Sequence, residues 1–456
     1  GQDINTSLGN AADPIDADQK LQEDALMSYV ASVNYSYDDK YYASFSFRRD
    51  GSSRLSPDTR WGNFWSLSAS WRLSQERFMQ PLKSVLSDLK LRASYGVNGN
   101  LPSSYYGYQS TYTTGAFYSG KPSPWESTLG NEELTWEKNY ALNLGLDIGL
   151  FSRVNVSLDW YTRTTKDLLM SKQLNSISGF SSLLTNVGQM RNTGVELEVR
   201  SNNIKTKDFS WTTAFNLSHN KNKILKLADL PWFVDGRYVR KEGYPFNTIY
   251  LREYAGVDPE TGSALYYDNQ QDENGNYTKN KVTDPGQASP IPLKDITPTI
   301  SGGFMNTFNY KFIDLSFNLS YSFGGYSYDN ASYILQDDGY SVISNKSTEQ
   351  RRRWQKPGDI TDVPRFVYGN KKGGNYNSSR AIHSTDHIRL KSLILGLNAP
   401  KAWLQKLGIG NARIYFSGTN LLTWAAYDQY DPEMSGVVGF YTPPLKTYAF
   451  GLELKF

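Results

Sequence analysis

The first candidate for chemistry is a pair of histidines, His383 and His387, separated by three residues. On a helix this spacing places two metal ligands on one face. Here the pair leads into an alternating strand pattern, and four residues along a strand span about 13 Å, which is too far for one metal ion. The chain has no Cys and only three His, so thiolate zinc sites and cysteine nucleophiles are excluded, and no metal site is expected.

Acidic and basic clusters give no stronger sign of a reaction. Asp272, Asn274 and Asn276 resemble the start of a calcium loop, but Gly275 occupies the fourth position instead of the sixth, which favours a polar turn. No segment suggests a cleft with the paired carboxylates of a glycoside hydrolase. The basic run 351–353 is expected to cap a loop or to contact carboxylates of a partner. At a net charge of +3, nucleic acid is not an expected partner, and neither an enzymatic activity nor a cofactor is predicted.

Aromatic side chains carry the binding signal, because they make up 14% of the residues. Rings suit sugar faces, and the Tyr hydroxyl and Trp N–H can bond hydroxyls or peptide amides. The same rings could instead pack loop against loop or form the girdle of a membrane protein. The candidate substrate-binding residues lie in two segments: Tyr105, Tyr106, Tyr108, Tyr112, Phe117, Tyr118 and Trp125 in the first, and Trp232, Phe233, Tyr238 and Tyr250 in the second.

The elements that would position these segments alternate with period two. Residues 139–150 (NYALNLGLDIGL) place Leu and Ile on one face and small or polar residues on the other, with Leu144 and Asn143 on opposite faces. Phe317 and Asn318 are separated in the same way within residues 313–323. The pattern predicts roughly thirteen strands and a bulge at Lys391–Ser392. The strands are expected at about 27–37, 41–48, 65–72, 89–96, 139–150, 154–161, 194–200, 211–218, 299–310, 313–323, 389–398, 413–419 and 448–456.

Two all-β architectures use strands of this kind. A soluble sandwich buries the apolar face, whereas a transmembrane antiparallel β-barrel turns the apolar face to lipid and the small polar face to a wet lumen. The polar face here is rich in Ser, Asn and Gly rather than Lys and Glu, aromatic residues lie at strand ends, and the chain ends on Phe456. These features favour a barrel in the outer membrane of a Gram-negative bacterium. No stretch of the sequence approaches the roughly 18 apolar residues of a membrane helix.

Link lengths assign the two sides of this barrel. Short links at 38–40, 151–153 and 311–312 alternate with long ones. Bacterial barrels have short periplasmic turns and long extracellular loops, so the long links are expected outside. The long links are about 97–135, 222–296, 326–386 and 424–446, and two further periplasmic links, 76–86 and 401–407, are each expected to form a single short helix.

The odd number of strands predicts that the sequence is one part of a barrel, because single-chain bacterial barrels have even numbers. A hairpin hidden within 222–296 would change the count by two and keep it odd. Residues 1–24 are then expected to be the remnant of an extracellular loop, and residues 25–456 the C-terminal part of the barrel. We expect that Gly1 is not the biological start, and that the first strands and a plug precede it in the gene or in a companion chain.

Segments spread along the sequence resemble the SusC/RagA family of TonB-dependent outer-membrane transporters. Because the segments occur in order and span nearly the whole chain, the resemblance is specific. They are Leu89–Asn100 (LKLRASYGVNGN), Asn186–Glu196 (NVGQMRNTGVE), Trp354–Asp359 (WQKPGD), and Asn420–Leu422 with Asp431–Glu433 (DPE).

The resemblance implies a barrel of about 22 strands, closed by an N-terminal plug, that imports oligosaccharides or oligopeptides. It implies a SusD-like surface lipoprotein as a lid over the lumen, and it allows a dimer of the transporter–lid pair. TonB would act through the N-terminal part outside this sequence, and the remaining N-terminal barrel strands would complete the wall within the outer-membrane lipid. The alternative is a soluble, secreted β-rich protein that binds or hydrolyses glycans. A requirement for detergent distinguishes the two.

Overall fold

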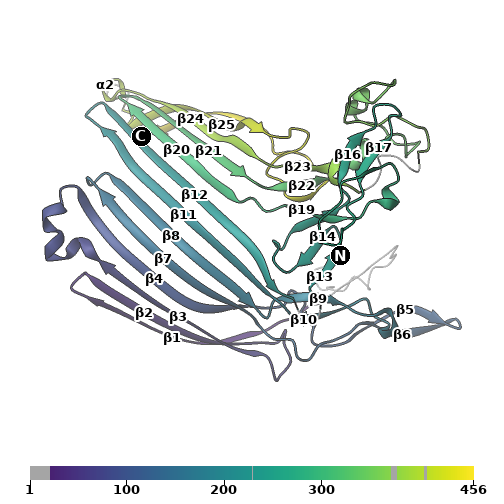
Figure 1. The fold of residues 1–456 in the computed structure, drawn as a ribbon. Helices are drawn as coiled ribbons and strands as arrows, with labels where there is room; N and C mark the ends of the chain where they lie inside the picture. The colour runs from purple at the N-terminus through teal and green to yellow at the C-terminus, as the bar shows by residue number, and fades with distance from the viewer. Residues whose placement is uncertain (1–20, 228–229, 371–376, 405–407) are drawn as a thin grey trace, which may run out of the picture.

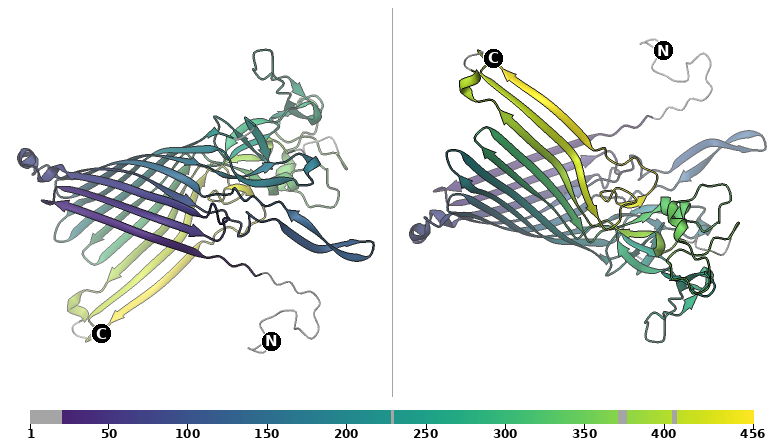
Figure 2. Two further views of the ribbon diagram at one scale, coloured as in Figure 1. Left: turned by 90° about the horizontal axis from the view of Figure 1, so that it is seen from below. Right: turned by 90° about the horizontal axis from the view of Figure 1, so that it is seen from above.

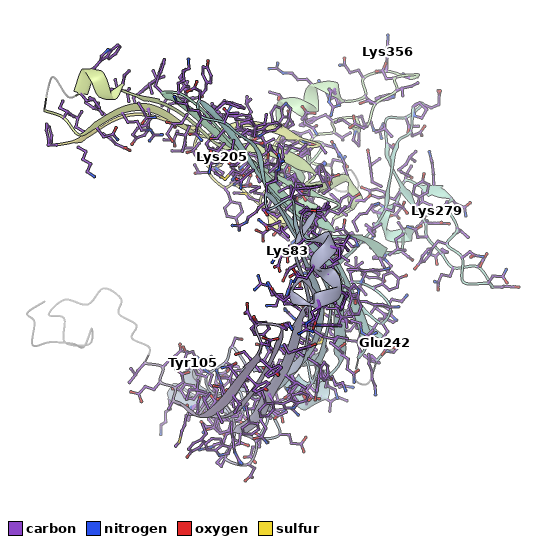
Figure 3. All side chains as sticks on the ribbon, turned by 90° about the vertical axis from the view of Figure 1, so that its left-hand side faces the viewer. Lys83, Tyr105, Lys205, Glu242, Lys279 and Lys356 are labelled. Atoms are coloured by element: carbon purple, nitrogen blue, oxygen red, sulfur yellow. The ribbon has the colours of Figure 1, made fainter. Side chains whose placement is uncertain are left out.

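A curved antiparallel sheet dominates the computed structural model, which describes residues 21–227, 230–370, 377–404 and 408–456. Figure 3 shows the sheet as an open crescent. The 13 strands follow one another in chain order across the sheet. They are β1 (Leu26–Tyr37), β2 (Tyr41–Ser52), β3 (Trp61–Arg72), β4 (Leu86–Asn100), β7 (Glu137–Leu150), β8 (Val154–Lys166), β11 (Gln189–Lys205), β12 (Phe209–Lys226), β20 (Ile300–Tyr310), β21 (Ile313–Phe323), β24 (His387–Asn398), β25 (Asn411–Ala425) and β27 (Thr447–Lys455).

Each predicted strand is present, with longer bounds in most cases. The predicted bulge is also confirmed, because the register of β24 slips between Leu390 and Ser392 against β25. Residues 222–296 contain short strands, but these lie in separate small sheets and leave the large sheet with 13 strands. The total of about 22 strands stays a prediction.

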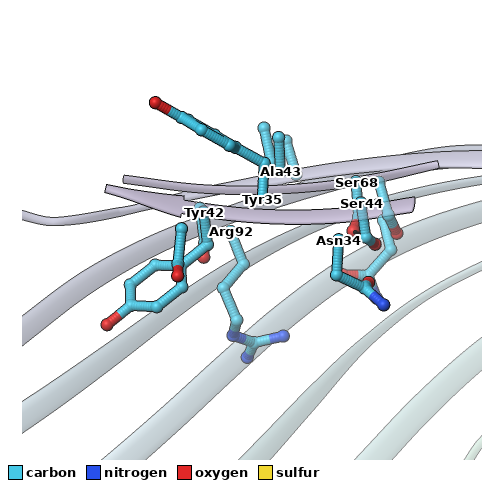
Figure 4. A pocket seen from close by; sticks show the side chains of 13 residues that line it. Asn34, Tyr35, Tyr42, Ala43, Ser44, Ser68 and Arg92 are labelled. Carbon is cyan, nitrogen blue, oxygen red and sulfur yellow. Dashed lines mark hydrogen bonds between the residues drawn. The ribbon is translucent and has the colours of Figure 1, made fainter. Parts of the chain in front are cut away.

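The two faces of the sheet differ as the alternation predicted. Leu144 lines an apolar groove of one face together with Trp71 and Trp160. Asn143 lines a polar hollow of the opposite face with Arg92 and a group of serines. Figure 4 shows this division at the first strands, where Tyr35 projects to one side and Asn34, Ser44, Ser68 and Arg92 to the other.

Short links and long links lie at opposite ends of the sheet, as predicted (Figure 1). At the short-link end, the predicted range 76–86 contains one short helix, Arg77–Leu82, which is a 3₁₀ helix with Pro81 inside it; a further 3₁₀ turn, Leu73–Gln75, precedes this range. Proline lacks the N–H that a continuing α-helix would need. The other predicted helix is present as α2 (Lys401–Leu404), while the rest of its range, 405–407, lies outside the described residues.

The long links carry small sheets of their own. The short strands are β5 (Thr111–Tyr118) with β6 (Lys121–Thr128), β9 (Leu169–Gln173) with β10 (Ser182–Asn186), β13 (Trp232–Asp235), β14 (Tyr238–Lys241), β15 (Thr248–Leu251) and β19 (Ile291–Asp295) in one sheet, β16 (Tyr254–Val257), β17 (Ala264–Tyr267) and β18 (Lys281–Val282) in another, and β22 (Tyr326–Asp329), β23 (Ile382–Ser384) and β26 (Gly436–Val438) in a third. The short helices of these links are α1 (Asn330–Leu335) and the 3₁₀ segments Ser176–Ser178, Pro285–Gln287, Thr348–Arg352 and Ser379–Ala381.

Buried apolar clusters lie in these links and at the adjoining rim ends of the large-sheet strands, as with Phe64 of β3. One cluster joins Leu55, Phe64, Leu134 and Trp136, and another joins Ile249, Leu251, Tyr328 and Ala381. The long links therefore form a packed rim, while the large sheet acts as a wall. Among the described residues, no helix is long and apolar enough to cross a membrane.

Candidate substrate-binding rim

The first predicted group of aromatics divides into a packed part and an exposed part. The guanidinium carbon of Arg54 lies 4.1 Å from the ring centre of Tyr105. The Tyr106 hydroxyl accepts a hydrogen bond from the Glu23 N–H. Tyr108 accepts one from its neighbour Gln109. Tyr106 is partly exposed, and the most exposed members belong to the hairpin β5–β6, which projects from the rim (Figures 1 and 2): Tyr112, Tyr118 and Trp125. The side chain of Phe117 lies outside the described residues.

The second predicted group belongs to a different sheet of the rim. Trp232 and Tyr250 pack together at 6.0 Å between ring centres. Tyr238 packs against the cluster formed by Ile249 and its neighbours, and Phe233 packs against a separate buried cluster. Among the described residues, no ring of the first predicted group packs against a ring of the second. Their role in substrate binding stays a prediction.

The last three long links interlock into one body. Strand β22 pairs antiparallel with β23 of the same link and in parallel with β26. The pairing with β26 joins the link after β21 to the link after β25. The link between β12 and β20 attaches through Tyr254, whose N–H donates to Ser379 Oγ at 2.9 Å. The indole N–H of Trp354 donates to the carbonyl of Pro259 at 2.8 Å. These contacts fix the loops relative to one another.

A cavity of about 860 Å³ opens where the last loop crosses the ends of β24 and β25. Ligand pockets of proteins have volumes of about 300–1,000 Å³. Its lining is aromatic at the mouth, where Phe440 and Tyr441 are exposed, and polar at the base, where Arg389 and Asp431 lie. Sequence reasoning missed this cavity, although the signal was present: residues 424–446, already recognised as a long loop, contain Trp424, Tyr427, Tyr430, Phe440 and Tyr441.

Two tyrosines of the last loop are held rigidly beside the cavity. The Tyr427 hydroxyl donates to Asp329 Oδ2 at 3.1 Å, and its ring stacks on His383 at 3.7 Å between ring centres. Tyr430 forms a short hydrogen bond with Ser327. Burial raises the pKa of Tyr427 and of Tyr430, so both phenols stay protonated at neutral pH.

An ion-pair network anchors the same loop to the wall. The side chain of Arg389 is 4% exposed and donates to Asp431 Oδ1 at 2.8 Å and to Glu433 Oε2 at 2.9 Å. Lys391 reaches Glu433 at 2.6 Å. Both carboxylates of the DPE segment are engaged by cations, an arrangement that suits a structural anchor rather than an acid–base pair for hydrolysis.

The other sequence candidates have local roles. His387 Nδ1 lies 2.8 Å from the Thr385 carbonyl, so it and His383 have separate neighbours, and no group of three or more metal-ligating side chains occurs among the described residues. The polar turn at Asp272 is confirmed, since its Oδ1 accepts from the N–H groups of Asn274 and Asn276. Of the basic run, Arg352 pairs with Glu349 within its own short helix.

These features define a class of protein. A wall with one apolar and one small polar face, short turns at one end and a packed aromatic rim at the other is the architecture of an outer-membrane β-barrel. Residues 2–249 match the family model described as TonB dependent receptor-like, beta-barrel, and the chain belongs to this family. It is a protein of the outer membrane.

Relatives with known names support the predicted resemblance. TonB-dependent receptor P3 of Formosa agariphila is 33% identical over 471 residues, covering 96% of this chain and 46% of the relative. TonB-dependent receptor SusC of Bacteroides thetaiotaomicron is 31% identical over 476 residues, covering 96% of this chain and 45% of SusC. The chain therefore spans about half the length of these relatives.

Solved structures match the fold across the chain. The RagAB peptide transporter superposes with a TM-score of 0.88 at 30% identity, over 100% of this chain and 50% of that one. The RagAB peptide importer in its closed-closed state gives a TM-score of 0.84 at 31% identity, over 94% of this chain and 48% of that one. The SusC/RagA resemblance is thus confirmed, and a soluble secreted protein is no longer an alternative.

Proposed function

We propose that this chain forms most of the wall and rim of a TonB-dependent importer for oligosaccharides or oligopeptides. The observation that carries the proposal is the whole-chain similarity to the RagAB peptide transporter at a TM-score of 0.88. The packed rim adds support, because its aromatic cavity has the size and lining of a ligand site. The chain acts as a carrier rather than as an enzyme.

The proposal also covers the parts of the importer that this sequence does not include. Under this proposal, residues 1–24, of which 1–20 lie outside the described residues, are the remnant of an outer loop, and residues 25–456 are the C-terminal part of a barrel of about 22 strands. The preceding strands and plug lie outside this sequence, and TonB acts through them. A SusD-like lipoprotein covers the rim, and two transporter–lid pairs can form a dimer.

Substrate contact is assigned to two kinds of aromatic side chain. The exposed rings at the cavity mouth, Phe440 and Tyr441, stack on sugar rings or peptide side chains. The predicted set Tyr105, Tyr106, Tyr108, Tyr112, Trp125, Trp232 and Tyr238 lines the wider opening of the rim. Of these, the most exposed, Tyr112, Trp125 and Trp232, are the members most available to a substrate.

Growth and uptake test the proposal. A strain lacking the full-length gene should fail to grow on one class within a panel of oligosaccharides and oligopeptides, and the intact gene should restore growth. Phe440→Ala with Tyr441→Ala should raise the half-saturating substrate concentration roughly two- to tenfold, the effect of losing stacking worth about 0.5–1.5 kcal/mol. Tyr340→Ala is the control, because Tyr340 is a similarly exposed loop tyrosine that does not line the cavity.

The lid is tested separately by purification from native membranes. A tagged full-length transporter should copurify with one lipoprotein in equal amount, through an interface larger than about 1,600 Å². Equal growth of the deletion and parent strains on every substrate would refute the importer. A transporter that remains alone in mild detergent would refute the lid.

A further inference from the structure

A dense basic patch lies on the outer face of the wall, just beyond its apolar band. On β12, Lys221 and Lys223 continue the outward series of Phe215 and Leu217 at two-residue steps. On β11, the outward side chains towards the rim are Leu197, Val195, Thr193 and then Arg191. The five cations of this patch are Lys138, Lys166, Arg191, Lys221 and Lys223.

The strand register gathers these cations from four neighbouring strands. Lys138 is the Cα partner of Lys166, and Arg191 is the Cα partner of Lys223. Lys221 is the next outward residue from Lys223 on β12, on the side of the apolar band. Strands are about 4.8 Å apart and two residues along a strand span about 6.8 Å, so the Cα atoms fall within an area roughly 14 Å by 14 Å.

Most of this positive charge is uncompensated. Lys138 pairs with Asp167 at 3.5 Å. The Lys166 ammonium lies over the ring of Tyr140, and Arg191 Nε donates to a threonine hydroxyl at 3.2 Å. Within the described ranges, no carboxylate pairs with Lys166, Arg191 or either lysine of β12, and all four are exposed.

The patch is a local feature of β7 to β12 rather than a ring around the barrel. At the rim ends of β21, β25 and β27, the corresponding outward side chains are Phe323, Trp424 and Tyr448. Aromatic residues at this depth anchor a barrel in the interface without selecting a headgroup. Clustered cations at the same depth add charge selectivity.

We propose that this patch binds the phosphate-bearing headgroup of a lipid in the outer leaflet. Its position directly beyond the apolar band is the depth at which headgroups lie. Cations at that depth attract anionic headgroups, and the planar guanidinium of Arg191 matches two phosphate oxygens at once. The face itself argues against a protein occupant, because it continues the lipid-facing surface of the wall.

Binding to isolated lipid tests the inference. The probe is the phosphorylated glycolipid extracted from the same bacterium's outer membrane, immobilised and presented to the detergent-purified full-length transporter. Each cation near an anionic membrane surface strengthens association about fivefold, so the triple substitution Arg191→Gln, Lys221→Gln, Lys223→Gln should weaken binding by about a hundredfold. Lys221→Arg with Lys223→Arg keeps the charge and should bind like the parent protein.

A matched control removes three other exposed cations, from the rim loops. Lys281→Gln, Arg351→Gln and Lys356→Gln lower the net charge equally and should leave lipid binding unchanged. Enzymatic removal of the lipid phosphates should weaken binding of the parent protein as much as the patch substitutions do. All variants should keep the heat-modifiable migration of a folded barrel on gels.

Three outcomes would overturn the inference. The patch and control variants would bind the lipid equally, or dephosphorylated lipid would bind as tightly as the intact form. Alternatively, the patch variant would lose a copurifying acidic protein while its lipid binding stayed unchanged, which would assign the surface to a protein partner. Because none of these readouts measures import, they are independent of the proposed transport function.

Discussion

Arg389 offers a sharp test of how the rim is held to the wall. Its guanidinium joins β24 to the last loop through Asp431 and Glu433, at 2.8 and 2.9 Å. The side chain of Asp431 is only 5% exposed, whereas that of Glu433 is 29% exposed. Glu433 also forms an ion pair with Lys391. Substituting Arg389→Met therefore leaves Asp431 as a buried, unpaired charge, while Glu433 keeps a partner.

The expected cost follows from the burial. Removing one partner of a buried ion pair costs about 3–5 kcal/mol. Because the network ties one loop to the wall, the loss should appear as local opening of that loop, by roughly 10²- to 4 × 10³-fold, rather than as unfolding of the barrel. Hydrogen exchange measured by mass spectrometry should show faster exchange in residues 426–438 and unchanged exchange in β7 and β8.

Two further variants make this test specific. Arg413→Met breaks a comparable contact at the opposite end of the wall, where Arg413 pairs with Asp314 at 2.7 Å, and it should not affect the last loop. Asp431→Asn added to Arg389→Met removes the unpaired charge and should restore part of the protection. Unchanged exchange of the loop in Arg389→Met, or an equal loss of protection throughout the barrel, would refute the reasoning.

Three other predictions follow from the faces and contacts of the chain. Leu144→Arg should destabilise the folded barrel by roughly 2–4 kcal/mol in lipid, while Asn143→Arg on the lumen face should be tolerated; equal effects in urea titrations would reject the assigned faces. Burial lowers the pKa of His383, so the folded rim should lose stability as the pH falls from about 6.5 towards that lowered pKa, and His383→Phe should abolish the dependence in exchange measurements. Asn186→Ala removes two hydrogen bonds to the backbone of Thr135, at 2.8 and 2.9 Å, and should loosen that loop contact by about 1–3 kcal/mol, measured as faster exchange or proteolysis there.

The wall could be predicted from the sequence because the two faces of each strand follow from the alternation of neighbouring residues. Alternation within residues 139–150 already separates the face of Leu144 from the face of Asn143. The bulge near Lys391 was visible as a slip in the same alternation. The short helix within 76–86 was also predicted, whereas the 3₁₀ turn before it, Leu73–Gln75, was not.

The rim could be predicted only in part, because its contacts join residues distant in the sequence. The stacking of His383 on Tyr427 and the pairing of β22 with β26 depend on how two separate loops fold together. No periodicity reports such packing. The cavity at the last loop could therefore not be predicted, although its aromatic residues are present in the sequence, because two other loops have denser runs of aromatic residues.

The central claim, active import through this barrel, is tested most directly by uptake of labelled oligomers into whole cells. Cells that carry the full-length gene should accumulate one class of labelled oligosaccharide or oligopeptide. Accumulation should stop when the gene is deleted, when TonB is inactivated, or when a protonophore removes the energy of the inner membrane. Uptake that continues at the same rate in cells without TonB would contradict the account.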